Sequence, residues 1–221
     1  ASLPLQPGTS ATSFFSNLLP EAGARARIAR SAGLSAENDF EFLRLFGADC
    51  AGSLQVISTA HDPWQASGDD LLYLTADDGA KLATRTGFAG FFSPGGRVRL
   101  SLAGAQNKLA VVKTNEGIAI PLDGRPSTHI LKLPNPDFRG LVENEALVLS
   151  IAKALGLPVV QHEIVRLGDV NLLLIDRYDR ALQDGEVLRL HQQDLCQATG
   201  LPPGIKYELE GGPSLKTTFD I

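Results

Sequence analysis

The stretch RLSLAGAQNKLAVV, which runs from Arg99 to Val112, places two strand-like runs on either side of a short turn. The small residues of the turn are Ala103, Gly104 and Ala105. Small side chains let backbone N–H groups approach an anion, and Gln106 or Lys108 can reach the same anion. The turn is neither a Walker A loop nor a G-x-G-x-x-G loop, so a β-hairpin turn that binds nothing remains an alternative.

The composition is that of an ordinary globular protein. Of the 221 residues, 43% are hydrophobic and 20% are charged. No apolar run approaches the ~18 residues that a membrane span needs. The formal charge is −5 and no block of Lys and Arg stands out, so we expect any contact with DNA to come through a partner. The start of the chain does not have the pattern of a signal peptide, which favours the cytoplasm.

The cysteines and histidines form no metal-binding or disulfide pattern. Cys50 and Cys196 are far apart, and the four histidines stand at unrelated spacings. We therefore expect two buried, inert thiols and no metal site. The chain lacks methionine and stops on TTFDI without a breaker or a cap, which favours a piece of a longer polypeptide.

The predicted elements change from helical to β along the chain. Residues 1 to about 60 favour helices that stop at Gly33 and Gly47, followed by a short strand in AGSLQVIS. From residue 97 onward, VRLSL, KLAVVK, IAIPL and HILKL predict antiparallel strands. A helix from about Leu141 to Leu155 comes next, and then a hairpin that turns at Gly168. We place the domain boundary between residues 96 and 97.

Lys132 lies on the mostly apolar strand HILKLP and needs a partner of opposite charge. The helix that follows carries an apolar arc, which we expect to face the core. The arc consists of Leu141, Val148, Leu149, Ile151, Ala152 and Leu155. Glu145 falls inside this arc, and a Lys132–Glu145 ion pair would relieve both charges. The alternative is that Glu145 reaches the edge of the helix or caps a backbone group.

An apolar strand, predicted to be central, ends in LLLIDRYDR. It puts Asp176, Arg177 and Tyr178 where the hinge of a kinase presents its backbone to adenine. A solvent-exposed strand end with a charged turn is the alternative. Gln192 and Asp194 follow near the next helix start, where Asp194 can simply be an N-terminal helix charge.

The order of turn, lysine strand, helix, hairpin and charged strand exit is the layout of the small lobe of a protein kinase. These segments resemble the HipA family of serine/threonine kinases, the toxins of bacterial type II toxin–antitoxin pairs. The resemblance covers nearly the whole chain and is carried by SLPLQPG, FFSNLLPE, SLAGAQNKLAV, THILKLPNP, ENE, LLLIDRYDR, LRLHQQDLCQATGL and KYELEGGPS. It implies an α+β, kinase-like nucleotide lobe (residues 97–221) behind a HipA-type N-terminal subdomain (residues 1–96).

The resemblance also implies an ATP site. In it, residues 103–108 form the phosphate-binding loop, Lys132 contacts the phosphates, residues 176–178 form the adenine hinge, and Gln192 lies near the nucleotide. Ser101 matches the loop serine that such kinases autophosphorylate. A phosphate there would repel ATP by like charge.

We expect the catalytic residues to lie outside this chain. In the family, an Asp five residues before an Asn supplies the catalytic loop, and a second, D-F-G-like Asp holds Mg²⁺. Neither is convincingly present before Ile221. The closing FDI suggests Asp220 as the metal ligand, but the catalytic loop should come first, so we expect a helix residue there. The chain by itself is therefore predicted to be inactive.

For the full-length protein, the resemblance implies phosphorylation of a translation factor such as an aminoacyl-tRNA synthetase. It implies neutralisation by a small helix-turn-helix antitoxin of the HipB kind, which binds operator DNA. The lack of a long apolar run predicts no contact with a membrane. One alternative is a kinase-derived module that has lost catalysis and binds an antitoxin or another protein. A second is an unrelated α+β domain in which SLAGAQNK is only a turn.

Overall fold

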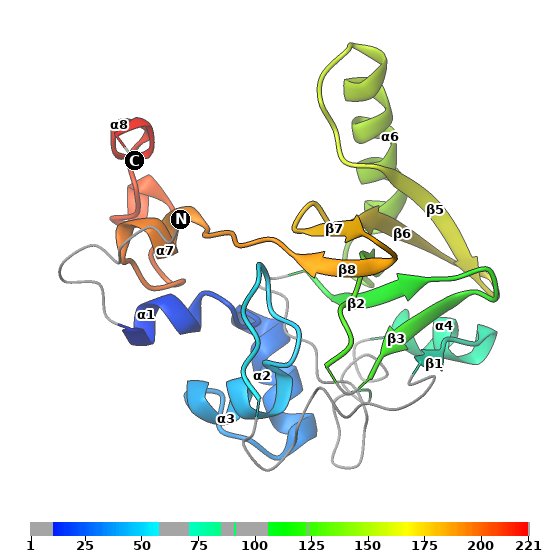
Figure 1. The fold of residues 1–221 in the computed structure, drawn as a ribbon, viewed down its shortest axis with the longest axis horizontal. Helices are drawn as coiled ribbons and strands as arrows, with labels where there is room; N and C mark the ends of the chain where they lie inside the picture. The colour runs from blue at the N-terminus through cyan, green and yellow to red at the C-terminus, as the bar shows by residue number, and fades with distance from the viewer. Residues whose placement is uncertain (1–10, 58–70, 85–90, 92–105, 123, 221) are drawn as a thin grey trace.

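The structure is a computed structural model that describes residues 11–57, 71–84, 91, 106–122 and 124–220 (Figure 1). Three helices come first: α1 (Ala11–Ser16), α2 (Ala22–Ala32) and α3 (Asp39–Phe46). Gly33 and Gly47 end α2 and α3, as predicted. Residues 51–57 contain turns and no strand, so the strand predicted from AGSLQVIS is wrong. Backbone groups in this segment bond to side chains from the hinge region instead of to a neighbouring strand.

Six strands form one sheet in the order β1-β3-β2-β4-β6-β5, and all neighbours are antiparallel. Their bounds are β1 (Leu71–Tyr73), β2 (Lys108–Lys113), β3 (Ile118–Pro121), β4 (His129–Lys132), β5 (His162–Leu167) and β6 (Val170–Asp176). The strands predicted from KLAVVK, IAIPL and HILKL are confirmed, as is the hairpin that turns at Gly168. Strand β6 lies between β4 and β5, which explains why its four central residues, 172–175, are all apolar and buried.

The first strand of this sheet comes from before the predicted domain boundary. β1 pairs with β3, with Leu72 opposite Ile120. Helix α4 (Ala76–Leu82) follows β1 and lies against β5. The sheet therefore contains strands from both sides of the predicted boundary between residues 96 and 97. The boundary itself stays a prediction. The strand predicted from VRLSL lies outside the described residues.

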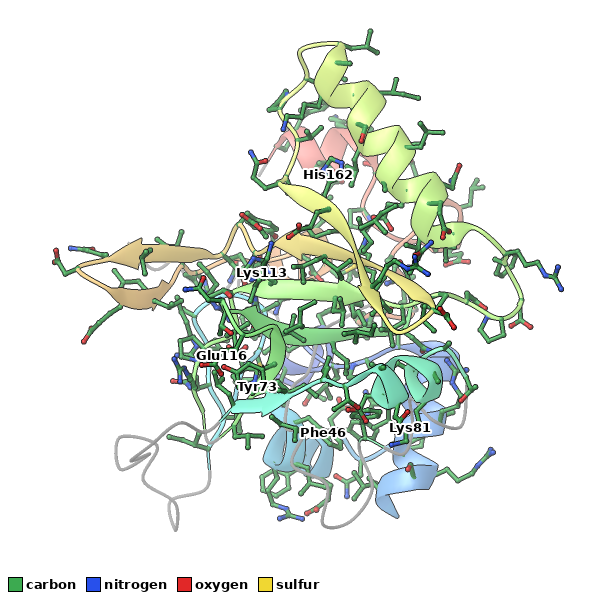
Figure 2. All side chains as sticks on the ribbon, turned by 90° about the vertical axis from the view of Figure 1, so that its right-hand side faces the viewer. Phe46, Tyr73, Lys81, Lys113, Glu116 and His162 are labelled. Atoms are coloured by element: carbon green, nitrogen blue, oxygen red, sulfur yellow. The ribbon has the colours of Figure 1, made fainter. Side chains whose placement is uncertain are left out.

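The two faces of the sheet are covered by different helices, because side chains alternate along each strand. The main core joins one face to α2 and α3 and includes Ile28, Phe42, Phe46, Leu109, Leu131 and Leu174. A smaller cluster joins the other face to α6 (Leu141–Ala154) and consists of Val142, Ala146, Leu173 and Ile175. Figure 2 shows α6 on one side of the sheet and Phe46 of α3 on the other.

Helix α6 buries a different stripe from the predicted one. Val142 and Ala146 are buried, whereas Val148, Ile151 and Leu155 are 56%, 50% and 74% exposed. The prediction that these three face the core is wrong. The C-terminal end of α6 projects away from the sheet (Figure 1), so the described residues offer nothing to cover this part of the arc.

The last described elements pack near the start of the chain. A hairpin of β7 (Arg180–Gln183) and β8 (Glu186–Arg189) leads to α7 (Leu195–Thr199), the 3-10 helix η2 (Glu208–Glu210) and α8 (Leu215–Phe219). Helix α7 contacts α1, and Gln197 Nε2 donates to the carbonyl of Phe14 at 3.1 Å. Asp194 caps the N-terminus of α7, which confirms the prediction of a charge at the helix start. Asp220 directly follows the last residue of α8 as its C-cap. No helix in the described part of the chain is long and apolar enough to span a membrane.

Candidate functional site

Two lysines meet where β2 begins and β4 ends. Lys108 and Lys132 are direct partners in the antiparallel register, so their side chains point to the same face of the sheet. Lys132 Nζ donates to Glu145 Oε1 of α6, and the ion pair predicted from the sequence is therefore present. The two side chains are 22% and 27% exposed, so solvent screens the pair and its contribution to stability is modest. Its main effect is to fix the position of the Lys132 ammonium group.

Lys108 has no ion-pair partner among the described residues, although charges surround it. Burial lowers the pKa of Lys108, and the positive charge of Lys132 lowers it further. Glu21 and Glu145 oppose this shift, and Glu21 already binds the ammonium group of Lys206. A largely desolvated cation beside a second cation is unfavourable until an anion joins them. This corner of the sheet is therefore suited to bind an anionic group.

The predicted hinge follows the end of β6. The N–H groups of Asp176 and Arg177 each donate at 3.0 Å, to the carbonyls of Gln161 and Thr128. Tyr178 is 71% exposed, and its N–H has no acceptor among the described residues. A backbone N–H that lacks an acceptor, in an exposed residue beside the exit of a buried strand, can donate to a ring nitrogen of a ligand.

Arg177 differs from Tyr178 because its side chain turns inward and only 4% of the residue is exposed. Its Nε donates to Asp179 Oδ1 at 2.8 Å, and its Nη1 donates to Ser127 Oγ at 2.8 Å and Asp49 Oδ2 at 3.3 Å. The side chain of Arg177 therefore cannot contact a ligand at the hinge, and only its backbone can. Sequence reasoning missed this, since no local pattern relates Arg177 to a carboxylate 128 residues away.

Three buried side-chain atoms in the described residues have no hydrogen-bond partner: Arg27 Nε, Gln106 Nε2 and Gln192 Oε1. Buried polar atoms normally have one. The resemblance places two of these residues, Gln106 and Gln192, at the nucleotide. The Gln106 amide can donate to a phosphate oxygen, and the Gln192 oxygen can accept from an amino or hydroxyl group. Burial raises the pKa of Tyr178, and a side-chain hydrogen bond from Gln192 opposes this rise, which places Gln192 beside the hinge.

A cavity of about 320 Å³ lies next to Gln106, between α2 and the loop after β4. Arg27 and Asn107 line it, and Arg27 Nη2 donates to Asn107 Oδ1 at 3.0 Å. Leu133 also lines it and belongs to the main core, on the face of the sheet opposite Lys132. The lysines and the hinge do not line this cavity, whereas Gln106 and Asn107, the two described residues that precede Lys108 in the predicted phosphate-binding loop, do.

Four predicted site residues lie outside the described residues: Ser101, Ala103, Gly104 and Ala105. The phosphate-binding loop and the autophosphorylation site therefore stay predictions. In the part of the chain that the structure describes, no group of three or more His, Cys, Asp or Glu side chains is placed to hold a metal ion. Cys50 and Cys196 are buried and free, as predicted, and burial raises the pKa of the Cys50 thiol to about 12.

An antiparallel sheet, a lysine paired with a helix glutamate and an open strand exit together define a kinase-like nucleotide lobe. Two family models match the chain: the HipA N-terminal domain matches residues 2–57, and the HipA-like C-terminal domain matches residues 100–221. The chain belongs to the HipA family.

Named relatives support this assignment. The chain is 41% identical over 216 residues to "Putative kinase Y4mE" of Sinorhizobium fredii, covering 94% of this chain and 50% of that protein. It is 32% identical over 201 residues to "Serine/threonine-protein kinase toxin HipA" of Shewanella oneidensis, covering 90% and 45%. A chain in the solved complex of HipA, HipB and operator DNA from Shewanella oneidensis matches with a TM-score of 0.71 and 31% identity, covering 95% and 49%. The chain thus spans about half the length of the curated relatives it matches.

Proposed function

We propose that this chain is the nucleotide-binding half of an ATP-dependent serine/threonine kinase of the HipA type. The observation that carries the proposal is the Lys132–Glu145 ion pair with the unpaired Lys108 directly beside it. Transfer of a phosphoryl group needs little covalent chemistry from the protein. It needs the phosphates held in place and their charge neutralised. Two adjacent cations, one of them fixed by a glutamate, meet both needs.

Each residue of the site has a task that its surroundings support. Lys132 and Lys108 neutralise phosphate oxygens, and the amide of Gln106 donates a further hydrogen bond. The backbone N–H of Tyr178 orients adenine, and the free oxygen of Gln192 accepts from the nucleoside. ATP supplies the phosphoryl group, with Mg²⁺ held by acidic residues that we expect outside this chain. The catalytic base is expected there as well.

The substrate and the partners of the full-length protein follow from the family. We infer that it phosphorylates a translation factor such as an aminoacyl-tRNA synthetase, and that Ser101 is its autophosphorylation site. The solved complex of a relative with HipB and operator DNA supports a HipB-like antitoxin as partner. With a formal charge of −5, the chain is expected to meet DNA only through that antitoxin.

Replacing Lys132 by Ala in the full-length protein tests the proposal. We expect phosphoryl transfer, measured with radiolabelled ATP, to fall by about two orders of magnitude or more, since a preorganised charge at the phosphates is lost. Lys113→Ala is the matched control. Lys113 is also a strand lysine, at the end of β2 (Figure 2). It pairs with Glu163 of β5, and both side chains are about half exposed. Its loss should leave the rate unchanged.

Near-normal turnover of the Lys132→Ala protein would remove Lys132 from this role. A different result would favour the other candidate. If the unmodified full-length protein binds ATP but transfers no phosphate to any protein, itself included, the chain belongs to a kinase-derived binding module instead.

A further inference from the structure

A turn from the N-terminal domain is bound to the hinge by buried charges. Asp49 is completely buried, and each of its oxygens accepts at least two hydrogen bonds. Its Oδ1 accepts from Arg180 Nη2 at 2.7 Å and from Arg189 Nε at 3.3 Å. Its Oδ2 accepts from the Ser127 N–H at 3.0 Å and from Arg177 Nη1 at 3.3 Å. One carboxylate thus binds Arg177 of the hinge and two arginines that follow the hinge, Arg180 and Arg189.

The backbone of the same turn is bound as well. Gly52 N–H donates to Asp179 Oδ2 at 2.7 Å, and the Gly52 carbonyl accepts from Arg180 Nη1 at 2.9 Å. The carbonyl of Cys50 accepts from Arg177 Nη2 at 3.0 Å. The turn also packs closely against Gln192, since a Cβ added at Gly52 would lie 3.0 Å from the backbone nitrogen of Gln192. Gly52 has a φ of +76°, so both the conformation and the close approach call for glycine here.

This arrangement fixes Tyr178 from both sides. Its neighbours Arg177 and Asp179 are 4% and 5% exposed and anchored to the turn, while Tyr178 itself is 71% exposed. Buried charges tolerate little displacement, since moving one partner leaves the other uncompensated away from water. The N–H of Tyr178 is therefore held in one place by contacts that Tyr178 does not make itself.

We propose that Asp49 is a positioning residue for nucleotide recognition. Asp49 lies in the part of the chain that matches the HipA N-terminal domain, and the hinge lies in the part that matches the C-terminal domain. The N-terminal domain thereby sets the backbone position that adenine needs. Asp49 does not influence the phosphates, which the lysines at the opposite end of β4 hold. The inference rests on the proposed function and adds to it a dependence of adenine binding on the N-terminal domain.

The test compares two ligands of the full-length protein by calorimetry: ATP and inorganic tripolyphosphate. Asp49→Asn keeps the shape of the side chain but removes its charge. We expect this variant to bind ATP about tenfold more weakly, the equivalent of one lost hydrogen bond to the base. Tripolyphosphate, which has no base, should bind with unchanged affinity. Lys132→Ala should weaken the binding of both ligands, and a purely structural defect would do the same.

A second variant keeps every charge and protects the test against a folding failure of Asp49→Asn. Gly52→Ala should displace the turn from Gln192 and weaken the binding of ATP alone. Gly33→Ala is the matched control, because Gly33 has a similar φ of +70° and open space around it. Gly33→Ala should leave the affinities for ATP and for tripolyphosphate unchanged.

Two results overturn the inference alone. In the first, folded Asp49→Asn and Gly52→Ala proteins bind ATP as tightly as the unmodified protein. In the second, they lose both ligands equally. An unmodified protein that binds neither ligand would overturn the proposed function, and this inference with it.

Discussion

At the scale of single residues, Lys108 is placed where its charge costs stability. It is largely desolvated, it faces Lys132 across the strand pair, and no carboxylate among the described residues pairs with it. A residue that only stabilised the fold would be better uncharged at this position. A bound polyanion would offset the free-energy cost of this desolvated charge, which explains why a lysine stands here.

Lys108→Met should therefore change stability and binding in opposite directions. We expect the nucleotide-free protein to melt at a higher temperature, because the side-chain stem stays buried while the desolvated charge is gone. ATP should bind about tenfold more weakly, since one charge-assisted hydrogen bond is lost. Thermal denaturation with and without ATP measures both effects. Lys81→Met, which changes an exposed lysine of α4, should alter neither.

The binding of ATP by the unmodified protein should also depend on pH. Because the pKa of Lys108 lies below the ordinary lysine value, Lys108 loses its charge at a lower pH than an exposed lysine would. The affinity should fall as the pH rises through this lowered pKa, and the Lys108→Met protein should lack the step. The same step in both proteins would assign it to another group.

At the scale of elements, α4 shows how packing overrides helix propensity. Thr75 and Asp78 form a capping box that starts this short helix. Gly79 in its middle faces β5, where an added Cβ would lie 2.4 Å from the Leu167 carbonyl oxygen and 2.6 Å from its Cβ. A glycine within a helix is usually unfavourable, but here it permits the helix to touch the strand.

Gly79→Ala should accordingly destabilise the protein by about 1–3 kcal/mol, the usual cost of overpacking. Gly23→Ala in α2 is the matched change, because the atom its Cβ would meet is the far end of the flexible Arg27 side chain, at 3.0 Å. It should leave the free energy of unfolding unchanged or raise it by up to ~1 kcal/mol. Urea unfolding measures the free energy of unfolding of both variants. If Gly79→Ala costs no more than Gly23→Ala, α4 can move away from β5 and the argument is wrong.

At the scale of the whole molecule, the two family domains are joined by buried ion pairs as well as by apolar packing. The side chains of Asp49, Arg177 and Arg180 are 0%, 1% and 3% exposed. Asp179 completes the group. Burial by itself would raise its pKa, but the hydrogen bonds and charge of Arg177, the N–H of Gly52 and the charge of Arg180 lower the pKa overall.

Acid should therefore loosen this junction. A carboxylate whose folded-state pKa is lowered stabilises the fold above the ordinary value of 3.8, and this contribution is lost as the pH falls through the lowered pKa. We expect the free energy of unfolding, measured with urea, to fall steeply below about pH 4. Asp179→Asn should be less stable at pH 7 and lose less on acidification. Asp77→Asn changes an exposed carboxylate, and its free energy of unfolding should vary with pH as in the unmodified protein. The same variation with pH in Asp179→Asn would contradict the argument.

Much of the fold and of the site follows from local patterns. Alternation along HILKL places Lys132 on one face of its strand, and the charge of Lys132 on that strand predicts a partner such as Glu145 on the next helix. The ion pair is confirmed, although most of the apolar arc used to orient Glu145 is exposed. The hairpin at Gly168, the buried strand before Asp176 and the cap at Asp194 depend on near neighbours in the same way.

The tertiary structure alone decided what covers each surface and which distant groups meet. The period of α6 identifies an apolar stripe, but the C-terminal end of α6 projects away from the sheet (Figure 1), and Ile151 and Leu155 are exposed. The composition around Arg177 suggests a charged surface turn, yet a carboxylate far away in sequence draws the side chain inside. A sequence pattern records the preferences of neighbours along the chain, whereas burial and charge pairing depend on segments that only folding brings together.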